Sequence, residues 1–146
     1  MAVGVTRNYS LDDTTCIVGT FPLNEYASGD GVKVAWNEDD FMVVQGSHGS
    51  VLRAKKHNNV AEATIRVMQG SPVNDFLSER INTDRNTRLG TFPFFLRDNF
   101  GATKVACAQA WVKRIPVITF AEEGKEVEWT IVLANPTFNI GANLPA

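Results

Sequence analysis

Few side chains in this sequence have the types and spacing that catalysis or metal binding requires. His48 and His57 lie in turn-like stretches beside Gly, Ser, Asn and Lys, and neither has a partner ligand at the spacing of a zinc site. An acidic run at residues 38–40 could bind a cation, but it lacks the alternating ligands of a calcium loop. No nucleophile elbow, Walker loop or dinucleotide-binding glycine loop occurs. We therefore expect solvated turns at these positions, no metal site, no cofactor and no enzymatic activity.

The two cysteines also lack a chemical signature. Cys16 and Cys107 lie far apart in the sequence, without a CxxC motif or a histidine at metal-ligand spacing. In a reducing compartment such residues usually behave as small apolar side chains. We expect two buried thiols, with a disulfide between them as the alternative.

Charge and hydropathy exclude several classes of protein. The 146 residues include 14 Lys and Arg and 16 Asp and Glu, for a net charge of −2. A dedicated nucleic-acid-binding protein normally has a strong basic excess instead. No apolar run approaches the length of about 18 residues that spans a bilayer, and the N-terminus lacks the basic and apolar regions of a secretory signal. We expect one soluble domain over residues 1–146, synthesised in the cytoplasm and without a membrane anchor.

Alternation of polar and apolar residues predicts a mainly β fold. Residues 60–69 and 126–134 show it most clearly, each with an apolar face and a polar face. The polar faces are Glu62, Thr64 and Arg66 in the first strand and Glu126, Glu128 and Thr130 in the second. Further strands are predicted at residues 14–21, 32–37, 41–45, 51–56, 91–98 and 103–115.

Two details of these strands predict local geometry. The glycines in residues 46–50 favour a hairpin turn, because glycine readily adopts the positive φ that such turns require. In the strand at 103–115, Ala106, Ala108 and Ala110 alternate with larger residues, which predicts that another layer closely approaches the alanine face.

One short amphipathic helix is predicted at about residues 72–86. Ser71 is a suitable N-cap, and Pro72 suits the first helical position because its missing N–H has no partner there. A helix of this length is marginal alone and must cover an apolar surface. The residues expected to pack on the rest of the protein form one stripe: Val73, Phe76, Leu77 and Ile81.

Together these elements predict an antiparallel β-sandwich or barrel of two sheets with one short α-helix packed on it. Extended arms are possible at both termini. The strand at 126–134 should end at the Asn-Pro pair that follows it, and the tail after Phe138 is expected to be loosely ordered.

Several stretches together resemble the tail-tube proteins of contractile-tailed, Mu-like bacteriophages. They are NYSLDD near the start, the long central run from GDGVKVAWN to SPVNDFLSERIN, and GKEVEWTIVLANP near the end. A hairpin with a Gly-Ser turn, a Ser-Pro-Val-Asn helix start and a late Glu-Trp-Thr strand occur in that order in the family. The resemblance covers most of the chain and is carried by order and spacing; residues 91–101 are less typical.

The resemblance implies a structural virion protein that is similar in fold to the tube protein of type VI secretion. Such subunits form homohexameric rings whose strands join into one continuous inner β-barrel, and the rings stack into a tube. The implied partners are other copies of the chain, the tail sheath protein, baseplate or initiator proteins, a tail terminator, and viral DNA that passes through without sequence-specific binding. Assembly would occur in the host cytoplasm, and the product would reside in the virion tail.

The resemblance assigns candidate roles to two sets of polar residues. A DNA-conducting bore should be polar without being strongly basic, because Lys and Arg contacts to phosphates would retain DNA. The candidate lumen-facing residues are Glu62, Thr64, Arg66, Glu126, Glu128 and Thr130; alternatively, these faces meet solvent or the sheath. The candidate inter-ring or inter-subunit residues are the acidic Glu38, Asp39 and Asp40 and the basic Arg53, Lys55 and Lys56, expected on different surfaces that meet when copies stack; a solvated hairpin tip is the alternative.

Two other functions remain as alternatives. One is a type VI-like secretion tube subunit, which differs in cargo. The other is a monomeric β-sandwich module that binds a sugar or peptide, and it would need an exposed aromatic platform. Trp36, Trp111 and Trp129 all lie in alternating strands, where burial is the stronger expectation.

Overall fold

The computed structural model describes residues 4, 14–23, 31–56, 59–99 and 101–141. Both predicted terminal arms, residues 28–30 of the central turn and His57 lie outside this part of the chain. The strands are β1 (Thr14–Val18), β2 (Phe21–Leu23), β3 (Val32–Trp36), β4 (Phe41–Gln45), β5 (Val51–Lys55), β6 (Val60–Met68), β7 (Phe92–Asp98), β8 (Lys104–Val112), β9 (Glu126–Ala134) and β10 (Thr137–Asn139). A single helix, α1 (Pro72–Thr87), lies among the described residues, so the mainly β fold with one helix is confirmed.

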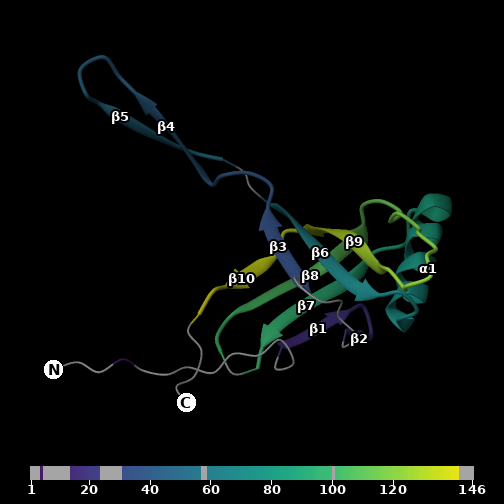
Figure 1. The fold of residues 1–146 in the computed structure, drawn as a ribbon. Coiled ribbons are helices and arrows are strands. Elements are labelled where there is room, and N and C mark those ends of the chain that lie inside the picture. Colours follow the sequence, from purple (N-terminus) through teal and green to yellow (C-terminus); the bar gives the residue numbers. More distant parts are fainter. Residues whose placement is uncertain (1–3, 5–13, 24–30, 57–58, 100, 142–146) are drawn as a thin grey trace.

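The strands form one large antiparallel sheet and a separate hairpin (Figure 1). The sheet has the order β2-β1-β7-β8-β9-β6-β3, with β10 also paired to β8, and the hairpin consists of β4 and β5. The predicted antiparallel, layered β fold is therefore confirmed, with one difference in how the layers are connected. Strands β3, β6 and β9 cross over β8, β7 and β1, and both layers belong to one continuous sheet that folds over (Figure 1). The sheet stays continuous because β8 pairs with β7 on one side and with β9 and β10 on the other.

Within the described residues the sheet does not close into a barrel. Its end strands, β2 and β3, each pair with one neighbour and not with each other. β2 is short and contains Pro22, which suits an edge because proline cannot donate a main-chain hydrogen bond. β3 has five residues and no proline, so its outer edge remains able to pair with another strand.

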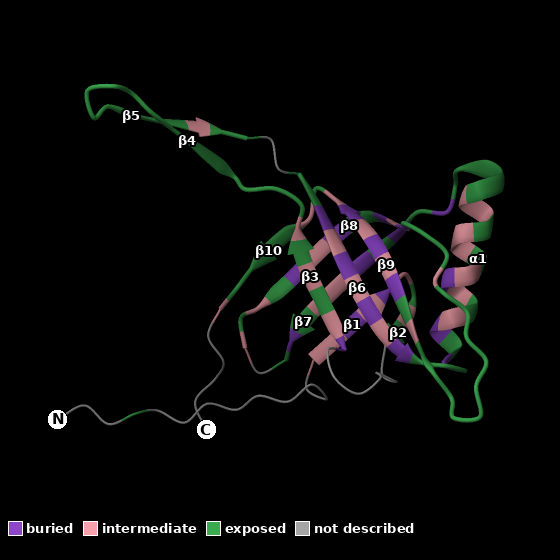
Figure 2. Ribbon diagram, turned by 45° about the horizontal axis from the view of Figure 1, so that its top comes forward, coloured by how far each residue is buried: buried purple, intermediate pink, exposed green. Residues whose placement is uncertain are grey.

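The core lies between the two layers of the folded sheet. In β6, Ala61, Ala63, Ile65 and Val67 are fully buried, and the residues between them are not, as predicted (Figure 2). β9 repeats the pattern with Trp129, Ile131 and Leu133 buried, as predicted. Burial of these aliphatic and aromatic side chains is the main stabilising contribution to the fold.

The alanine stripe predicted in β8 is wrong. Ala110 is buried, whereas Ala108 is exposed and Ala106 is half-buried. The cause is a β-bulge: Phe92 is opposite Ala110 and Phe94 is opposite Cys107, so β8 contains one extra residue relative to β7 and its side-chain alternation shifts there. The Sγ of Cys107 lies 3.0 Å from the carbonyl oxygen of Gln109 and 3.2 Å from that of Ala134 beside this irregularity.

The last strand, β10, was not predicted. It continues the pairing of β9 with β8 in unchanged register, since Ala134 lies opposite Gln109 and Thr137 lies opposite Ala106. The intervening Asn135 has a φ of 51°, which breaks the strand locally without shifting the register. Part of the segment that was expected to be loosely ordered is therefore attached to the sheet.

Helix α1 begins as predicted, with Ser71 at the N-cap and Pro72 in the first turn, and it ends one residue later than predicted. The side chain of Ser71 forms no capping hydrogen bond in the structure. Val73 and Leu77 are buried, and Phe76 and Ile81 are partly buried against the core. Phe76 packs against Phe21 and Phe92 at ring-centroid distances of 5.3 and 5.7 Å. Gly19, at the turn after β1, has a φ of 65° and leaves no room for a Cβ beside the ring of Phe76.

Candidate assembly surfaces

The polar faces of β6 and β9 lie side by side on one surface of the sheet. The two strands pair along their full length, with Thr64 opposite Thr130 and Arg66 opposite Glu128. The six predicted lumen-facing residues therefore share one surface that points away from the core. A hollow of about 310 Å³ on this surface is lined by Lys33, Ala35, Glu62, Thr64, Arg66 and Glu128.

The charges on this surface are paired across strands. The guanidinium of Arg66 contacts the carboxylate of Glu126, and its Nε lies 3.8 Å from Oε2 of Glu128. The ammonium of Lys113 contacts the carboxylate of Glu62. Exposed pairs of this kind contribute about 0–1 kcal/mol each to stability. Their larger effect here is that cations and carboxylates on the surface are close to neutralising each other.

Two basic residues on this surface were missed by the sequence prediction. Lys33 of β3 lies opposite Thr64 in the register, and Lys113 follows β8. The alternation of β3 could have placed Lys33 on a polar face, but the sequence carried no signal that β3 pairs with β6. Lys113 reaches this surface because its main-chain N–H donates to the carbonyl of Thr130. With these two residues, three cations (Lys33, Arg66, Lys113) and three carboxylates (Glu62, Glu126, Glu128) share the surface. A fourth cation, Arg114, lines an adjoining hollow with Glu126, Glu128 and Thr130.

The β4–β5 hairpin extends away from the sheet (Figure 1). Its turn lies at residues 46–50, as predicted, where the N–H of Gly46 donates to the carbonyl of Ser50 at 2.7 Å and Gly49 has a φ of 82°. Every residue of β4 is exposed, and β5 is exposed except for half-buried Ala54. The strands bury no apolar face against the rest of the described chain, so their stability must depend on the turn, on pairing with each other, or on a partner.

The predicted inter-subunit charges lie together at the base of the hairpin. The N–H of Lys56 donates to the carbonyl of Asp40 at 2.8 Å, and Phe41 lies opposite Lys55. The guanidinium of Arg53 lies 3.9 Å from the centroid of the Phe41 ring. The expectation that acidic and basic groups occupy different surfaces, with the basic group at a hairpin tip, is therefore wrong: Glu38, Asp39 and Asp40 lead into β4, while Arg53, Lys55 and Lys56 lie in or directly after its partner β5.

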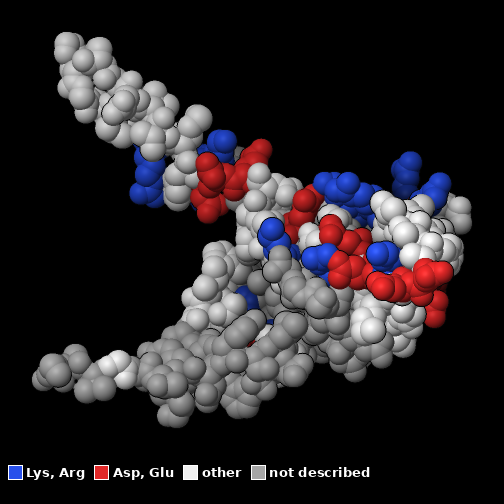
Figure 3. Space-filling model, in the orientation of Figure 1, with Lys and Arg blue, Asp and Glu red and all other residues white. Residues whose placement is uncertain are grey.

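Beyond its base the hairpin carries no Lys, Arg, Asp or Glu; its strands have exposed apolar side chains and its turn has uncharged polar ones. Figure 3 shows charged side chains gathered near its base and none along its outer part. His48, in the turn, is exposed as predicted. The exposed apolar side chains are Phe41, Met42, Val43, Val44, Val51 and Leu52, each between 44% and 65% exposed.

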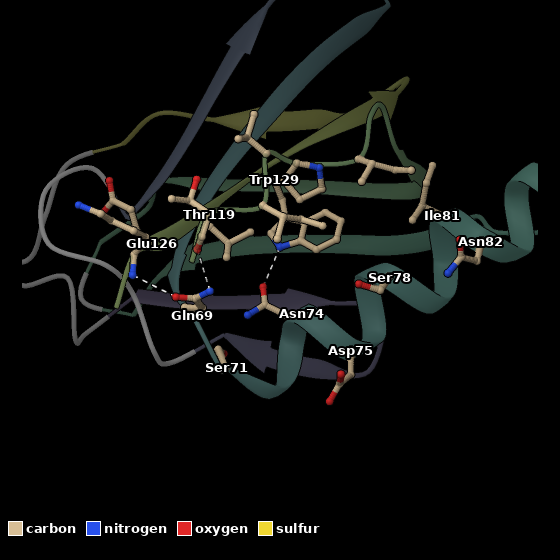
Figure 4. Close-up of a pocket in the computed structure, with 17 residues that line it drawn as sticks. Gln69, Ser71, Asn74, Asp75, Ser78, Ile81, Asn82, Thr119, Glu126 and Trp129 are labelled. Carbon is tan, nitrogen blue, oxygen red and sulfur yellow. Dashed lines mark hydrogen bonds between the residues drawn. The ribbon is translucent and has the colours of Figure 1, made fainter. Parts of the chain in front are cut away.

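A pocket of about 410 Å³ lies between the first half of α1 and the segment of residues 115–119 (Figure 4). The indole N–H of Trp129 donates to Oδ1 of Asn74 at 2.8 Å at its floor. The side chain of Gln69 donates to the carbonyl of Thr119 at 3.2 Å and accepts from the N–H of Lys125 at 3.1 Å. These bonds fix the relative positions of the helix, β9 and the segment.

The described part of the chain tests the predictions about the cysteines, metal ligands and membrane-spanning helices. Cys16 and Cys107 are both buried free thiols, as expected, and burial raises the pKa of Cys16 to about 12. In residues 14–23, 31–56, 59–99 and 101–141, no three or more His, Cys, Asp or Glu side chains are arranged so that they could hold a metal ion. No helix among these residues has both the length and the apolar character needed to span a bilayer.

The predicted aromatic residues do not form a platform on the surface. Trp129 is 3% exposed, and Trp36 and Trp111 are half-buried. The ring of Trp36 packs edge-on against Phe138 at a centroid distance of 4.8 Å. The three tryptophans therefore do not provide the exposed platform expected of a monomeric sugar- or peptide-binding module.

Three solved structures with a similar fold come from contractile injection systems and a related prophage particle. The sheath/tube terminator of the extracellular contractile injection system PVC matches with a TM-score of 0.66 and 11% identity, covering 94% of this chain and 100% of that chain. The tube-terminating cap of the anti-feeding prophage also gives 0.66, at 10% identity and 95% coverage of both chains. A chain of the PVC sheath–tube complex gives 0.55, at 10% identity, covering 95% of this chain and 93% of that chain. The fold is thus that of tube and terminator proteins.

The sequence itself defines the family. Residues 9–141 match the family described as bacteriophage PhiTE tail tube protein, and the chain belongs to that family of phage tail structural proteins. A comparison with curated protein sequences found no match. The predicted resemblance to phage tail-tube proteins is therefore confirmed.

Proposed function

We propose that this chain, as one tail-tube domain over residues 1–146, forms hexameric rings that stack into the tube of a contractile phage tail and conduct DNA. The observation that carries the proposal is a polar surface on β3, β6 and β9 that ends at a proline-free edge of β3, with which no other described strand pairs. An open edge of this kind can pair with a neighbouring copy, and a closed ring leaves no edge exposed. Its role is structural, without catalysis or a cofactor.

The dimensions support a bore that admits DNA. If each of six copies contributes four strands, a barrel of about 24 strands with a spacing of about 4.8 Å and a tilt of about 40° has a backbone diameter of about 48 Å. Side chains reduce this to a bore of about 40 Å, wider than a DNA duplex of about 20 Å. The surface of β6 and β9 would line this bore.

The charge pairing suits DNA in transit. Phosphate contacts with Lys and Arg dominate non-specific DNA affinity and would slow release. On the proposed lumen surface, Arg66 and Lys113 already contact carboxylates of the same chain. Their charges are therefore balanced locally, and passing DNA would meet a wetted wall with little net attraction.

The exposed face of helix α1 is the candidate surface for contact with the sheath. Helix α1 packs its apolar residues inward and presents Glu79, Asn82 and Arg85 outward. We propose that this face meets the tail sheath protein, that baseplate or initiator and terminator proteins bind the ends of the tube, and that the hairpin base contacts a neighbouring copy. The tube would be assembled in the host cytoplasm and reside in the virion tail.

A second candidate is a tube terminator, favoured by the likeness of the fold to two terminating proteins. Negative-stain microscopy of the concentrated, purified chain separates the two roles. A tube subunit should give hollow filaments of many stacked rings, whereas a terminator should give single rings that bind only tube ends. Monomers at all concentrations, also in the presence of baseplate initiator, would contradict both roles.

A further inference from the structure

A second apolar surface lies on the side of the molecule opposite the hairpin. Residues 115–120, between β8 and β9, form an extended segment beside α1. Its exposed side chains are Ile115, Val117, Ile118 and Phe120, at 49%, 86%, 71% and 88% exposure. A contiguous apolar patch on a monomer rarely exceeds a few hundred Å² unless it is an interaction site.

Most main-chain groups of this segment have no hydrogen-bond partner in the described part of the chain. Among the described residues, its one hydrogen bond to another element is the carbonyl of Thr119 accepting from Gln69. The two outer edges of the β4–β5 hairpin are likewise unpaired within the described chain. Two extended, apolar elements with free main-chain groups can pair by strand addition, which satisfies both sets of groups.

A single molecule cannot bring these elements together. Figure 1 shows the hairpin projecting to one side of the sheet and α1, which borders the segment, on the other. From Trp36 to the hairpin turn the chain runs for about 11 residues, a reach of about 35 Å when extended. That length is sufficient to cross to an adjacent copy, and a contact between unlike surfaces of identical copies propagates into rings or stacks.

The charges beside the two apolar stretches have opposite signs. Acidic residues 38–40 precede β4, and Arg114 directly precedes the segment. Lys55 and Lys56 end the hairpin, whereas Glu122 and Glu123 follow the segment. A parallel alignment with either hairpin strand therefore places opposite charges together and supports this pairing.

We propose that the β4–β5 hairpin of one copy docks on residues 115–120 of a neighbouring copy. This inference rests on the proposed function and names the partner of the hairpin within the assembly. It explains why the strands of the hairpin carry exposed apolar side chains and why residues 115–120 do not join the sheet of their own chain.

Disulfide trapping between two singly substituted proteins tests the contact. Val43→Cys and Leu52→Cys place a thiol on either hairpin strand, and Ile118→Cys places one on the segment; all three positions are well exposed, so folding should be retained. Either hairpin variant is assembled into tubes together with Ile118→Cys, oxidised, and run on a non-reducing gel. Because each chain carries one added cysteine and Cys16 and Cys107 are buried, a linked dimer reports a contact between copies within about 7 Å.

The matched control replaces Ile118→Cys with Asn86→Cys, an exposed position on α1. We expect at least one hairpin variant to give several-fold more disulfide-linked dimer when assembled with Ile118→Cys than when assembled with Asn86→Cys. The same hairpin variant assembled by itself should also give less dimer. Tubes that form normally while neither hairpin variant links to Ile118→Cys above control would overturn this inference and leave the tube function standing. Failure of the unsubstituted chain to form any ring or tube would overturn both.

Discussion

The burial of Trp129 gives the sharpest test of how this sheet is packed. The indole is 3% exposed on β9, and its N–H donates to Oδ1 of Asn74 on α1 at 2.8 Å. Trp129→Ala removes a large buried aromatic group and leaves a cavity, which should lower the free energy of unfolding by about 3–5 kcal/mol. Since small domains are stable by only about 5–15 kcal/mol, this loss would leave the variant marginal.

Two smaller changes divide this effect into packing and hydrogen bonding. Trp129→Phe keeps most of the apolar contact and loses the hydrogen bond, so it should cost about 1–2 kcal/mol. Asn74→Ala leaves the indole N–H without its partner and should cost about 1–3 kcal/mol. If the hydrogen bond couples the two residues, the double variant Trp129→Phe with Asn74→Ala should cost less than the sum of the single changes.

The assay is urea unfolding followed by far-UV circular dichroism, which does not depend on tryptophan fluorescence. Trp111→Ala is the matched control, because Trp111 is also a strand tryptophan but is half-buried, and it should cost clearly less. Unchanged stability of Trp129→Ala would refute the assignment of the inward face of β9, and with it the placement of Glu126, Glu128 and Thr130 on the opposite surface.

The thiols and the lumen charges give two further predictions. At pH 8 a maleimide reagent should leave Cys16 and Cys107 unmodified in the folded protein and label both in urea, as read by mass spectrometry. Burial raises the pKa of Cys16 from 9.0 to about 12, so its thiol ionises more readily in the unfolded chain. The contribution of Cys16 to the free energy of unfolding should therefore be complete below pH 9 and decline as the pH rises above it. Equal labelling rates with and without urea would show that the thiols are accessible. Phage particles carrying Glu128→Lys should release DNA more slowly than particles carrying Glu79→Lys, because a lysine facing the bore would contact phosphates. Glu79→Lys is the matched control: it changes the charge equally on the face of α1, and the side chain of Glu79 is 67% exposed, compared with 61% for Glu128. Equal release rates would argue that Glu128 does not face the DNA.

The sequence was sufficient to place the elements whose periodicity is strong. In β6 and β9 the alternation extends over nine residues each, and both faces follow it. Helix α1 was also predictable, because a proline in the first turn and a spaced apolar stripe specify both its start and its buried side. Since β6 and β9 then pair in register, their polar residues were correctly expected to form polar faces.

Features that depend on which strands pair could not be predicted. The bulge in β8 arises from its pairing with β7, and sequence alternation alone placed Ala106 and Ala110 on one face. The continuity of the sheet and the approach of Lys33 and Lys113 to the polar surface are likewise consequences of long-range pairing. The acidic and basic groups of the hairpin are separated in sequence by its strands, so only the register shows that they meet at its base.

A cryo-electron microscopy reconstruction of the assembled protein tests the central claim most directly. The account predicts a hollow tube in which neighbouring copies hydrogen-bond through open sheet edges, with the side chains of Thr64 and Thr130 facing the bore and α1 on the outside. A reconstruction in which each copy keeps its sheet to itself, or in which α1 faces the bore, would contradict it.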